Sequence, residues 1–222
     1  MRVSAIIPAY NEEKTIYDLV RAIKNSGIFD EVIVVNDGSR DNTAFLAQKA
    51  GAVVLTLPKN LGKGEALIVG VRASQGEVIL FFDADLLGVT KEHLENLVNP
   101  VKNGEADMVV GIQPKYRNVY EINNSIPLIS GQRALRRKLF EGVPEKLLKG
   151  YQVEEALNYF AKLEDKKVKV IILEGLEHLQ KIPKSDLLKG VCGYFKMALQ
   201  IAKIFVLARI FGVFRKIKRL FA

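Results

Sequence analysis

The sequence is organised around residues 78–85, Val-Ile-Leu-Phe-Phe-Asp-Ala-Asp. Five apolar residues in a row, rich in β-branched and aromatic types, are typical of a strand buried on both faces of a sheet. The run ends in two carboxylates, Asp83 and Asp85, one residue apart. Two carboxylates close together at the end of a buried strand are unfavourable unless a cation or hydroxyl groups bind them. Taken alone, the pair is also explained by a strand followed by a polar turn.

Strand and helix patterns alternate on both sides of this run. Further strands are predicted over residues 3–7, 31–35, 52–57 and 107–112. Helices are predicted over residues 11–27, from a cap near Asp41 or Asn42, and over residues 64–73 and 90–101. Because the connections are short, we predict an α/β fold with a mostly parallel central sheet, right-handed crossovers and flanking helices.

The second half of the chain has a less regular pattern. Residues 113–129 show no clear period and many polar side chains, which indicates a loop region over the site. Helices are predicted over residues 133–139 and 152–162, and a late strand over residues 168–173.

Polar clusters follow three of the predicted strands, at residues 8–12, 36–39 and 83–85. A helix cap or a turn explains each cluster by itself. Because parallel strands point the same way, however, the three clusters converge on one edge of the sheet. A nucleotide needs such a set: a pocket for the base, carboxylates for the ribose hydroxyls and the base edge, and a metal ligand for the diphosphate.

Four motifs in order carry a resemblance to a known family. They lie at residues 6–13 (Ile-Ile-Pro-Ala-Tyr-Asn-Glu-Glu), 35–43, 60–64 (Asn-Leu-Gly-Lys-Gly) and 82–85. They closely resemble the family 2 glycosyltransferases of the GT-A fold, strongly over about residues 3 to 112 and more weakly to residue 155. The resemblance implies an inverting transfer of a sugar from a nucleotide diphosphate, of the UDP-glucose or GDP-mannose type, usually with Mg²⁺ or Mn²⁺.

The resemblance also implies roles for individual residues. Nucleotide-sugar binding would fall to Pro8, Ala9, Tyr10, Glu12, Asp37, Gly38, Lys63, Asp83 and Ala84. Asp85 would bind the metal, since a hard divalent cation with oxygen ligands neutralises the charge that develops on a diphosphate leaving group. His178 would join the metal, as a late histidine does in relatives that make glucosyl-3-phosphoglycerate; the alternative is a surface or packing histidine.

Lys63 lies in a Gly-Lys-Gly loop before a helix, well placed to bring a positive charge to the phosphates. The alternative interpretation of Lys63 is a solvated lysine in a turn. This lysine is therefore expected at the phosphate end of the nucleotide.

Two further catalytic roles are expected at the acceptor. Glu154 and Glu155 are about 100° apart on a helix, so only one faces the site, and the family motif favours Glu154. As a general base it would deprotonate an acceptor hydroxyl, whereas an acceptor phosphate, already ionised, would need it only for orientation. Arg133 is expected to form an acceptor phosphate site with Arg136 and Arg137.

The basic charge is concentrated at the C-terminal end. The chain has a net charge of +8, and eight Lys and Arg against one acid in residues 185–222 account for +7 of it. No 18-residue uncharged run exists there, so a spanning helix is not predicted. We expect a GT-A catalytic domain at residues 1–184 and a basic amphipathic tail at residues 185–222 that lies on an anionic membrane surface. Packing on the domain or in an oligomer is the alternative.

The predicted function is transfer of a hexose to a membrane lipid-linked acceptor, with a polyprenyl phosphate first, as in the similar dolichol-phosphate sugar synthases. The alternatives are a soluble phosphorylated acceptor such as 3-phosphoglycerate, and a non-enzymatic basic membrane-binding module with an inactive nucleotide site. A near-neutral domain and few aromatic residues among the tail charges argue against nucleic acid. The single Cys192 and the short N-terminal apolar run predict a cytoplasmic protein, peripheral on the inner face of the cell membrane.

Overall fold

A computed structural model describes residues 1–117, 130–149 and 153–179. These residues form an α/β fold around a seven-stranded sheet with strand order β3-β2-β1-β4-β7-β6-β8. The strands are β1 (Val3–Ala9), β2 (Glu31–Asn36), β3 (Val53–Thr56), β4 (Val78–Phe81), β6 (Met108–Ile112), β7 (Arg133–Arg136) and β8 (Val168–Ile172). All adjacent pairs are parallel except the two that β7 makes, with β4 and with β6. The mostly parallel sheet is confirmed.

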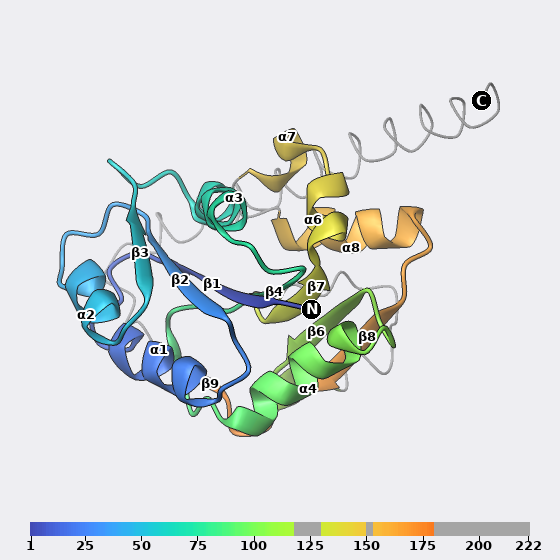
Figure 1. The fold of residues 1–222 in the computed structure, drawn as a ribbon, viewed down its shortest axis with the longest axis horizontal. Helices are drawn as coiled ribbons and strands as arrows, with labels where there is room; N and C mark the ends of the chain where they lie inside the picture. Colours follow the sequence, from blue (N-terminus) through green and yellow to red (C-terminus); the bar gives the residue numbers. More distant parts are fainter. Residues whose placement is uncertain (118–129, 150–152, 180–222) are drawn as a thin grey trace.

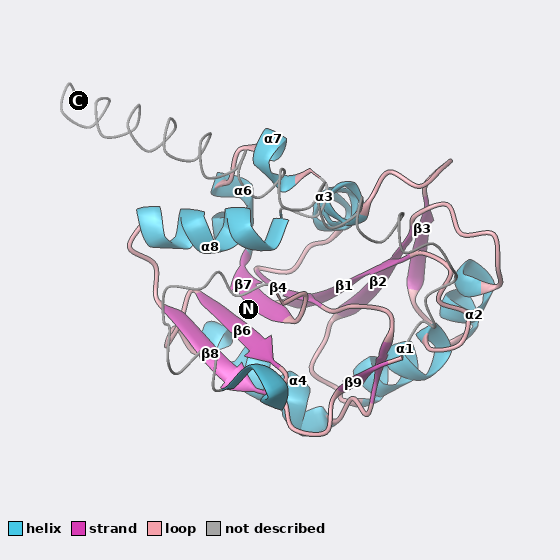
Figure 2. Ribbon diagram, turned by 180° about the vertical axis from the view of Figure 1, so that it is seen from behind, coloured by secondary structure: helices cyan, strands magenta, loops and turns pink. Residues whose placement is uncertain are grey.

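Helices cover both faces of the sheet (Figures 1 and 2). One face carries α1 (Ile16–Asn25), α2 (Thr43–Lys49) and α4 (Lys91–Lys102). The other carries α3 (Lys63–Ala73), α6 (Arg137–Gly142), α7 (Glu145–Leu148) and α8 (Val153–Leu163). A short 3₁₀ turn, η1 (Pro114–Tyr116), follows β6, and a small second sheet pairs β5 (Leu86–Leu87) with β9 (Glu177–His178) in antiparallel fashion.

Strand β4 has the central place that its apolar run predicts. It lies between β1 and β7, and all four of its residues are buried. Its side chains alternate between the two cores, with Leu80 packed under α1 and α4 and Ile79 and Phe81 packed under α3, α6 and α8. A strand with apolar neighbours on both faces needs an unbroken apolar sequence rather than an alternating one.

The helix predicted over residues 133–139 is wrong in its first half. Residues Arg133–Arg136 form strand β7, and the helix begins only at Arg137. Ala134 packs in one core and Leu135 in the other, which is the two-residue alternation of a strand. Pairing with β4 and β6 on both sides therefore outweighs the helix-forming residue types of this segment.

Two predicted regions lie largely outside the described residues. Residues 118–129 of the predicted loop region are not described, and neither is the proposed tail at residues 185–222, nor the boundary at residue 184. Among the residues that are described, no helix is both long and apolar enough to cross a bilayer.

Candidate functional site

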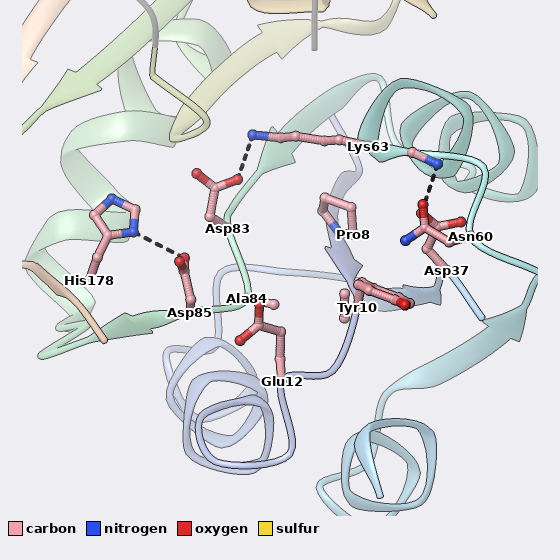
Figure 3. Close-up of a pocket in the computed structure, with 12 residues that line it drawn as sticks. Pro8, Tyr10, Glu12, Asp37, Asn60, Lys63, Asp83, Ala84, Asp85 and His178 are labelled. Atoms are coloured by element: carbon pink, nitrogen blue, oxygen red, sulfur yellow. Dashed lines mark hydrogen bonds and ion pairs between the residues drawn. The ribbon is translucent and has the colours of Figure 1, made fainter. Parts of the chain in front are cut away.

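A pocket of about 310 Å³ lies at the carboxyl ends of β1, β2 and β4 (Figure 3). Its lining residues are Pro8, Ala9, Tyr10, Glu12, Asp37, Asn60, Gly62, Lys63, Asp83, Ala84, Asp85 and His178. The three polar clusters thus converge at one sheet edge, as the parallel topology predicts. Of the nine residues expected to bind the nucleotide sugar, all but Gly38 line this pocket.

Gly38 lies outside the pocket lining and has a structural role in the wall behind it. It adopts a left-handed conformation with φ of 71°. A Cβ there would lie 2.6 Å from the backbone carbon of Lys59. The glycine therefore allows the chain at residues 59–60 to pass close behind the pocket, where a side chain would block it.

Asp37 holds the loop that leads into α3. Its two carboxylate oxygens accept hydrogen bonds from the backbone amides of Leu61 at 2.7 Å and of Gly62 at 2.9 Å. The side chain is buried at the pocket wall. Because a carboxylate has about four acceptor positions, lone pairs are left for a ligand hydroxyl in addition to this anchoring role.

Asp83 and Asp85 point to different partners. The chain turns at Ala84 and Asp85, separated from the end of β4 by two residues. Asp83 faces Lys63, whereas Asp85 faces His178 (Figure 3). The turn separates the two carboxylates and gives each its own contacts.

Lys63 joins two acidic residues at the pocket wall. Its Nζ lies 2.6 Å from Asp83 Oδ1 and 2.7 Å from Glu154 Oε1. Burial alone would lower the pKa of Lys63, but the two carboxylates outweigh it and raise the pKa above its usual value. Lys63 is therefore a fixed cation in the pocket rather than a solvated turn residue, and Glu154 reaches the site through it.

Gln132 binds the other carboxylate oxygen of Asp83 and Gly131 leaves room for it, and neither contact is among the sequence-based predictions. Gln132 Nε2 donates to Asp83 Oδ2 at 2.8 Å. A Cβ on Gly131 would lie 2.1 Å from the same oxygen, so only glycine lets the carboxylate reach this position. Both residues lie in the part of the chain where the family resemblance is weaker, and their contact with Asp83 depends on the pairing of β7 with β4.

His178 reaches the pocket from β9, far along the chain. Its Nδ1 lies 3.0 Å from Asp85 Oδ1. The pairing of Leu86 with His178 and the hydrogen bond from the Leu179 amide to the Asp85 carbonyl fix this position. The hydrogen bond to Asp85 raises the pKa of His178, partly against burial, and the charges of Asp85 and Asp83 add to the rise.

The expected arginine site for an acceptor phosphate is wrong. Arg133 is 1% exposed and does not line the pocket. Its guanidinium donates to the carbonyl of Ser130 at 2.6 and 3.0 Å, the carbonyl of Glu154 at 3.2 Å and Oδ1 of Asn158 at 3.2 Å. Burial lowers the pKa of Arg133 to about 10, against the charges of Glu154 and Asp83. This side chain ties β7 to α8 rather than binding a ligand.

The other two arginines point elsewhere. Arg137 donates to the carbonyls of Val71, Ser74 and Gly76 at 2.7–2.9 Å, which terminates α3. Arg136 lies 3.9 Å from Asp107 at the opposite end of the sheet from the pocket. The three guanidinium groups therefore do not converge, because a strand directs alternate side chains to opposite faces and the helix start turns the third away.

A divalent cation fits the residues around Asp85. Asp85 and His178 supply a carboxylate and an imidazole side by side at the pocket (Figure 3). Within residues 1–117, 130–149 and 153–179, no three His, Cys, Asp or Glu side chains form a metal-binding group. That donor set suits an ion held by one or two protein ligands and completed by substrate phosphates, which is how proteins usually bind Mg²⁺.

Comparisons with known proteins agree with this geometry. A glucosyl-3-phosphoglycerate synthase of Mycobacterium tuberculosis is 35% identical over 117 residues, covering 49% of this chain and 36% of the relative. A dolichyl-phosphate β-glucosyltransferase of Trichomonas vaginalis is 40% identical over 113 residues, covering 44% of this chain and 33% of the relative. The chain thus spans about a third of the length of these curated relatives.

A solved structure extends the likeness over most of the chain. The M. tuberculosis glucosyl-3-phosphoglycerate synthase in complex with Mn²⁺, UDP-glucose and phosphoglyceric acid superimposes with a TM-score of 0.71 and 27% identity, over 81% of this chain and 72% of that one. The predicted GT-A fold is confirmed by this match. A family model described as glycosyl transferase family 2 matches residues 4–147, more than half of the chain. The chain therefore belongs to glycosyl transferase family 2.

Proposed function

We propose that the chain transfers glucose from UDP-glucose, with inversion, to a phosphorylated acceptor. Asp85 beside His178, in a pocket formed by three strand ends, is the observation that carries the proposal. The two curated relatives are, by name, enzymes that form a glucosyl derivative of a phosphorylated acceptor. A solved relative binds Mn²⁺ and UDP-glucose. A nucleotide sugar with another base would fit the same pocket chemistry. The assay described below tests it by using several nucleotide sugars.

The nucleotide would lie across the carboxyl end of β1. Pro8, Ala9 and Tyr10 form a partly apolar wall for the base, and Tyr10 is exposed enough to contact a ligand. Asp37 and Glu12 offer carboxylates to the ribose hydroxyls from the neighbouring strand ends. The diphosphate would then lie near Lys63 and Asp85, the two positions in the pocket at which a positive charge can be placed.

Asp85 and His178 would hold Mg²⁺ or Mn²⁺, with diphosphate oxygens as further ligands. A bound divalent cation supplies neutralisation of the charge that develops on the UDP leaving group. Lys63 adds a second positive charge from the other side of Asp83. Asp83, held by Lys63 and Gln132, presents a fixed acceptor to the sugar or the ribose. The acceptor oxygen attacks the anomeric carbon as the bond to UDP breaks, in one in-line displacement.

A polyprenyl phosphate is the acceptor that we propose first. Glu154 is bound to Lys63 and is thus engaged in an ion pair, while an ionised phosphate oxygen attacks without a base. The basic, apolar composition of residues 185–222 supports a site at an anionic membrane, peripheral on its cytoplasmic face. The second candidate is a soluble acceptor such as 3-phosphoglycerate, which the likeness to the solved synthase favours. In that case Glu154 would have to accept the proton of a hydroxyl.

The test is a two-acceptor assay with product analysis. The purified chain is incubated with UDP-glucose and Mn²⁺ and either polyprenyl phosphate in anionic vesicles or 3-phosphoglycerate, and products are identified by mass spectrometry. We expect a glucosylated polyprenyl phosphate. A glucosylated product from 3-phosphoglycerate alone would replace the lipid acceptor with the soluble one, and no product with any of several nucleotide sugars would overturn the transferase proposal.

The membrane proposal has a separate test. The full chain is expected to sediment with anionic vesicles, and a chain truncated after Lys184 is expected to stay in the supernatant. Equal sedimentation of both would contradict the role proposed for residues 185–222.

A further inference from the structure

Both histidines of the chain are connected with the stretch from Leu173 to His178, which follows β8 and ends in β9. His178 lies within the segment and faces Asp85. His93 lies in the first turn of α4, is 8% exposed, and contacts the segment from outside the pocket. The mechanism proposed above uses His178 and leaves His93 without a role.

The ring of His93 has a hydrogen bond at each nitrogen. Nδ1 accepts from the backbone amide of Thr90 at 3.3 Å, so the proton of the neutral ring lies on Nε2. Nε2 then donates to the carbonyl of Glu174 at 2.8 Å. The Thr90 hydroxyl in turn accepts from the amide of His93 at 3.3 Å, which completes a capping box. One side chain thus fixes the start of α4 and the turn before β9 together.

The segment that carries His178 needs such outer support. Strands β5 and β9 pair over only two residues each, and an isolated two-stranded sheet is marginally stable. Besides His93, two further side chains hold the turn. Gln113 Nε2 donates to the carbonyl of Leu176 at 3.3 Å, and Arg117 forms an ion pair with the side chain of Glu174. Gly175 itself has φ of 76°, and its carbonyl would lie 2.6 Å from a Cβ on Gly88. The turn therefore packs closely against the chain at Gly88.

We propose that His93 is a positioning residue that, through Glu174, holds His178 at Asp85 and thereby sets the affinity of the site for its divalent cation. The inference rests on the proposed metal role of Asp85 and His178. Partners that orient a metal ligand without touching the metal typically change affinity by about 10–100-fold when they are removed. Loss of the His93 hydrogen bond is expected to have an effect of that class.

The variants separate positioning from helix capping. His93→Phe keeps an aromatic ring but cannot bind Glu174 or Thr90. His93→Gln keeps an amide donor near the position of Nε2. Thr90→Ala is the matched control, because it removes the other half of the capping box and leaves the Glu174 contact in place.

The first readout needs no metal. The chain has two histidines, so His93→Phe leaves His178 as the single source of imidazole NMR signals, and its Cε1–H resonance is assigned without ambiguity. We expect this resonance to shift in His93→Phe at fixed pH and to stay at its wild-type position in Thr90→Ala. An unshifted resonance in His93→Phe, or an equal shift in Thr90→Ala, would overturn the positioning role.

The second readout is Mn²⁺ affinity in the presence of UDP, measured by electron paramagnetic resonance. His93→Phe is expected to bind Mn²⁺ at least about tenfold more weakly. His93→Gln should recover most of the loss, and Thr90→Ala should bind as the wild type does. In a His178→Ala background, His93→Phe should have no additional effect, because it acts through the missing side chain. An undiminished loss in that background would overturn the inference.

The two proposals fail in different ways. If Mn²⁺ does not broaden the His178 resonance of the wild type, the metal role in the proposed function is wrong, while the metal-free shift still decides whether His93 places His178. If Mn²⁺ broadens the resonance equally in the wild type and in His93→Phe with equal affinity, the metal role holds and the positioning role of His93 is wrong.

Discussion

Lys63 Nζ lies 2.7 Å from Glu154 Oε1, so the residue that the family motif assigns as general base forms an ion pair with a residue of the donor pocket. Glu154 is nearly buried, and the same ammonium group contacts Asp83 at 2.6 Å. The donor side and the acceptor side of the site are therefore coupled through one lysine. This contact decides how each side responds to substitution.

Substitution Lys63→Met should destabilise the fold as well as the site. It leaves Asp83 and Glu154 close together without their shared cation, and removal of one partner of a buried ion pair costs about 3 kcal/mol or more. Urea unfolding measures the loss. Lys149→Met is the control, since it removes an exposed lysine paired with Glu65 at 3.0 Å and should change little. Equal midpoints for Lys63→Met and wild type would contradict the coupling.

Substitution Glu154→Gln distinguishes the two acceptor classes. With a phosphate acceptor, which is already ionised, turnover should fall only modestly. With a hydroxyl acceptor, loss of a general base lowers kcat by about 10²–10⁴-fold. Steady-state kinetics with both acceptors measures the difference, and a large loss of kcat with polyprenyl phosphate would contradict the mechanism proposed here.

Substitution Gly131→Ala should displace Asp83. The added Cβ would lie 2.1 Å from Asp83 Oδ2, and the carboxylate can leave only by breaking its contacts with Gln132 and Lys63. Thermal unfolding should show a lower Tm for Gly131→Ala. In the Gly131→Ala/Asp83→Ala double variant the clash is gone, so the additional loss caused by Gly131→Ala should disappear. A constant loss in both backgrounds would place its cause elsewhere.

Glu155 gives a pH-dependent prediction. It is 6% exposed, and its Oε2 has no hydrogen-bond partner among the residues that the structure describes. Burial raises the pKa of Glu155 above 4.5, and the charge of Glu154 adds to the rise. The folded state therefore binds this proton more tightly than the unfolded state, which contributes stability below pH 4.5 that is lost as pH rises through the folded pKa.

Glu155→Gln should accordingly raise Tm at pH 8, where the wild type carries a buried charge with its Oε2 unbonded among the described residues. The gain in Tm should shrink as pH falls toward 4.5, because the wild-type carboxyl then takes up a proton and becomes neutral like the glutamine. Thermal unfolding at several pH values measures this. A gain that grows toward acid pH would contradict the assigned direction.

The elements that the sequence predicts well are those with a strong local signal. The apolar runs of β1, β2 and β4 and the periodicity of α1 are local, and so is the position of each polar cluster after its strand. Parallel topology then places the clusters together without further information. For this reason eight of the nine expected nucleotide-binding residues line the pocket.

The errors occur where a residue's role depends on distant pairing. Arg133 is a strand residue because β4 and β6 flank it. Its guanidinium forms hydrogen bonds with Ser130 and with α8. No local sequence pattern predicts the ion pair between Lys63 and Glu154. The same is true of the hydrogen bonds from Gln132 to Asp83 and from His93 to Glu174. Each of these contacts joins elements that the sequence places far apart, and each depends on the finished sheet.

The central claim is that Asp85 and its neighbours bind a cation and, through it, the diphosphate of a sugar nucleotide. Isothermal titration of UDP-glucose with and without Mn²⁺, on the wild type and on Asp85→Ala, tests it most directly. We expect Mn²⁺ to strengthen binding to the wild type and to have no effect on Asp85→Ala. Equal strengthening by Mn²⁺ in both proteins would contradict the claim.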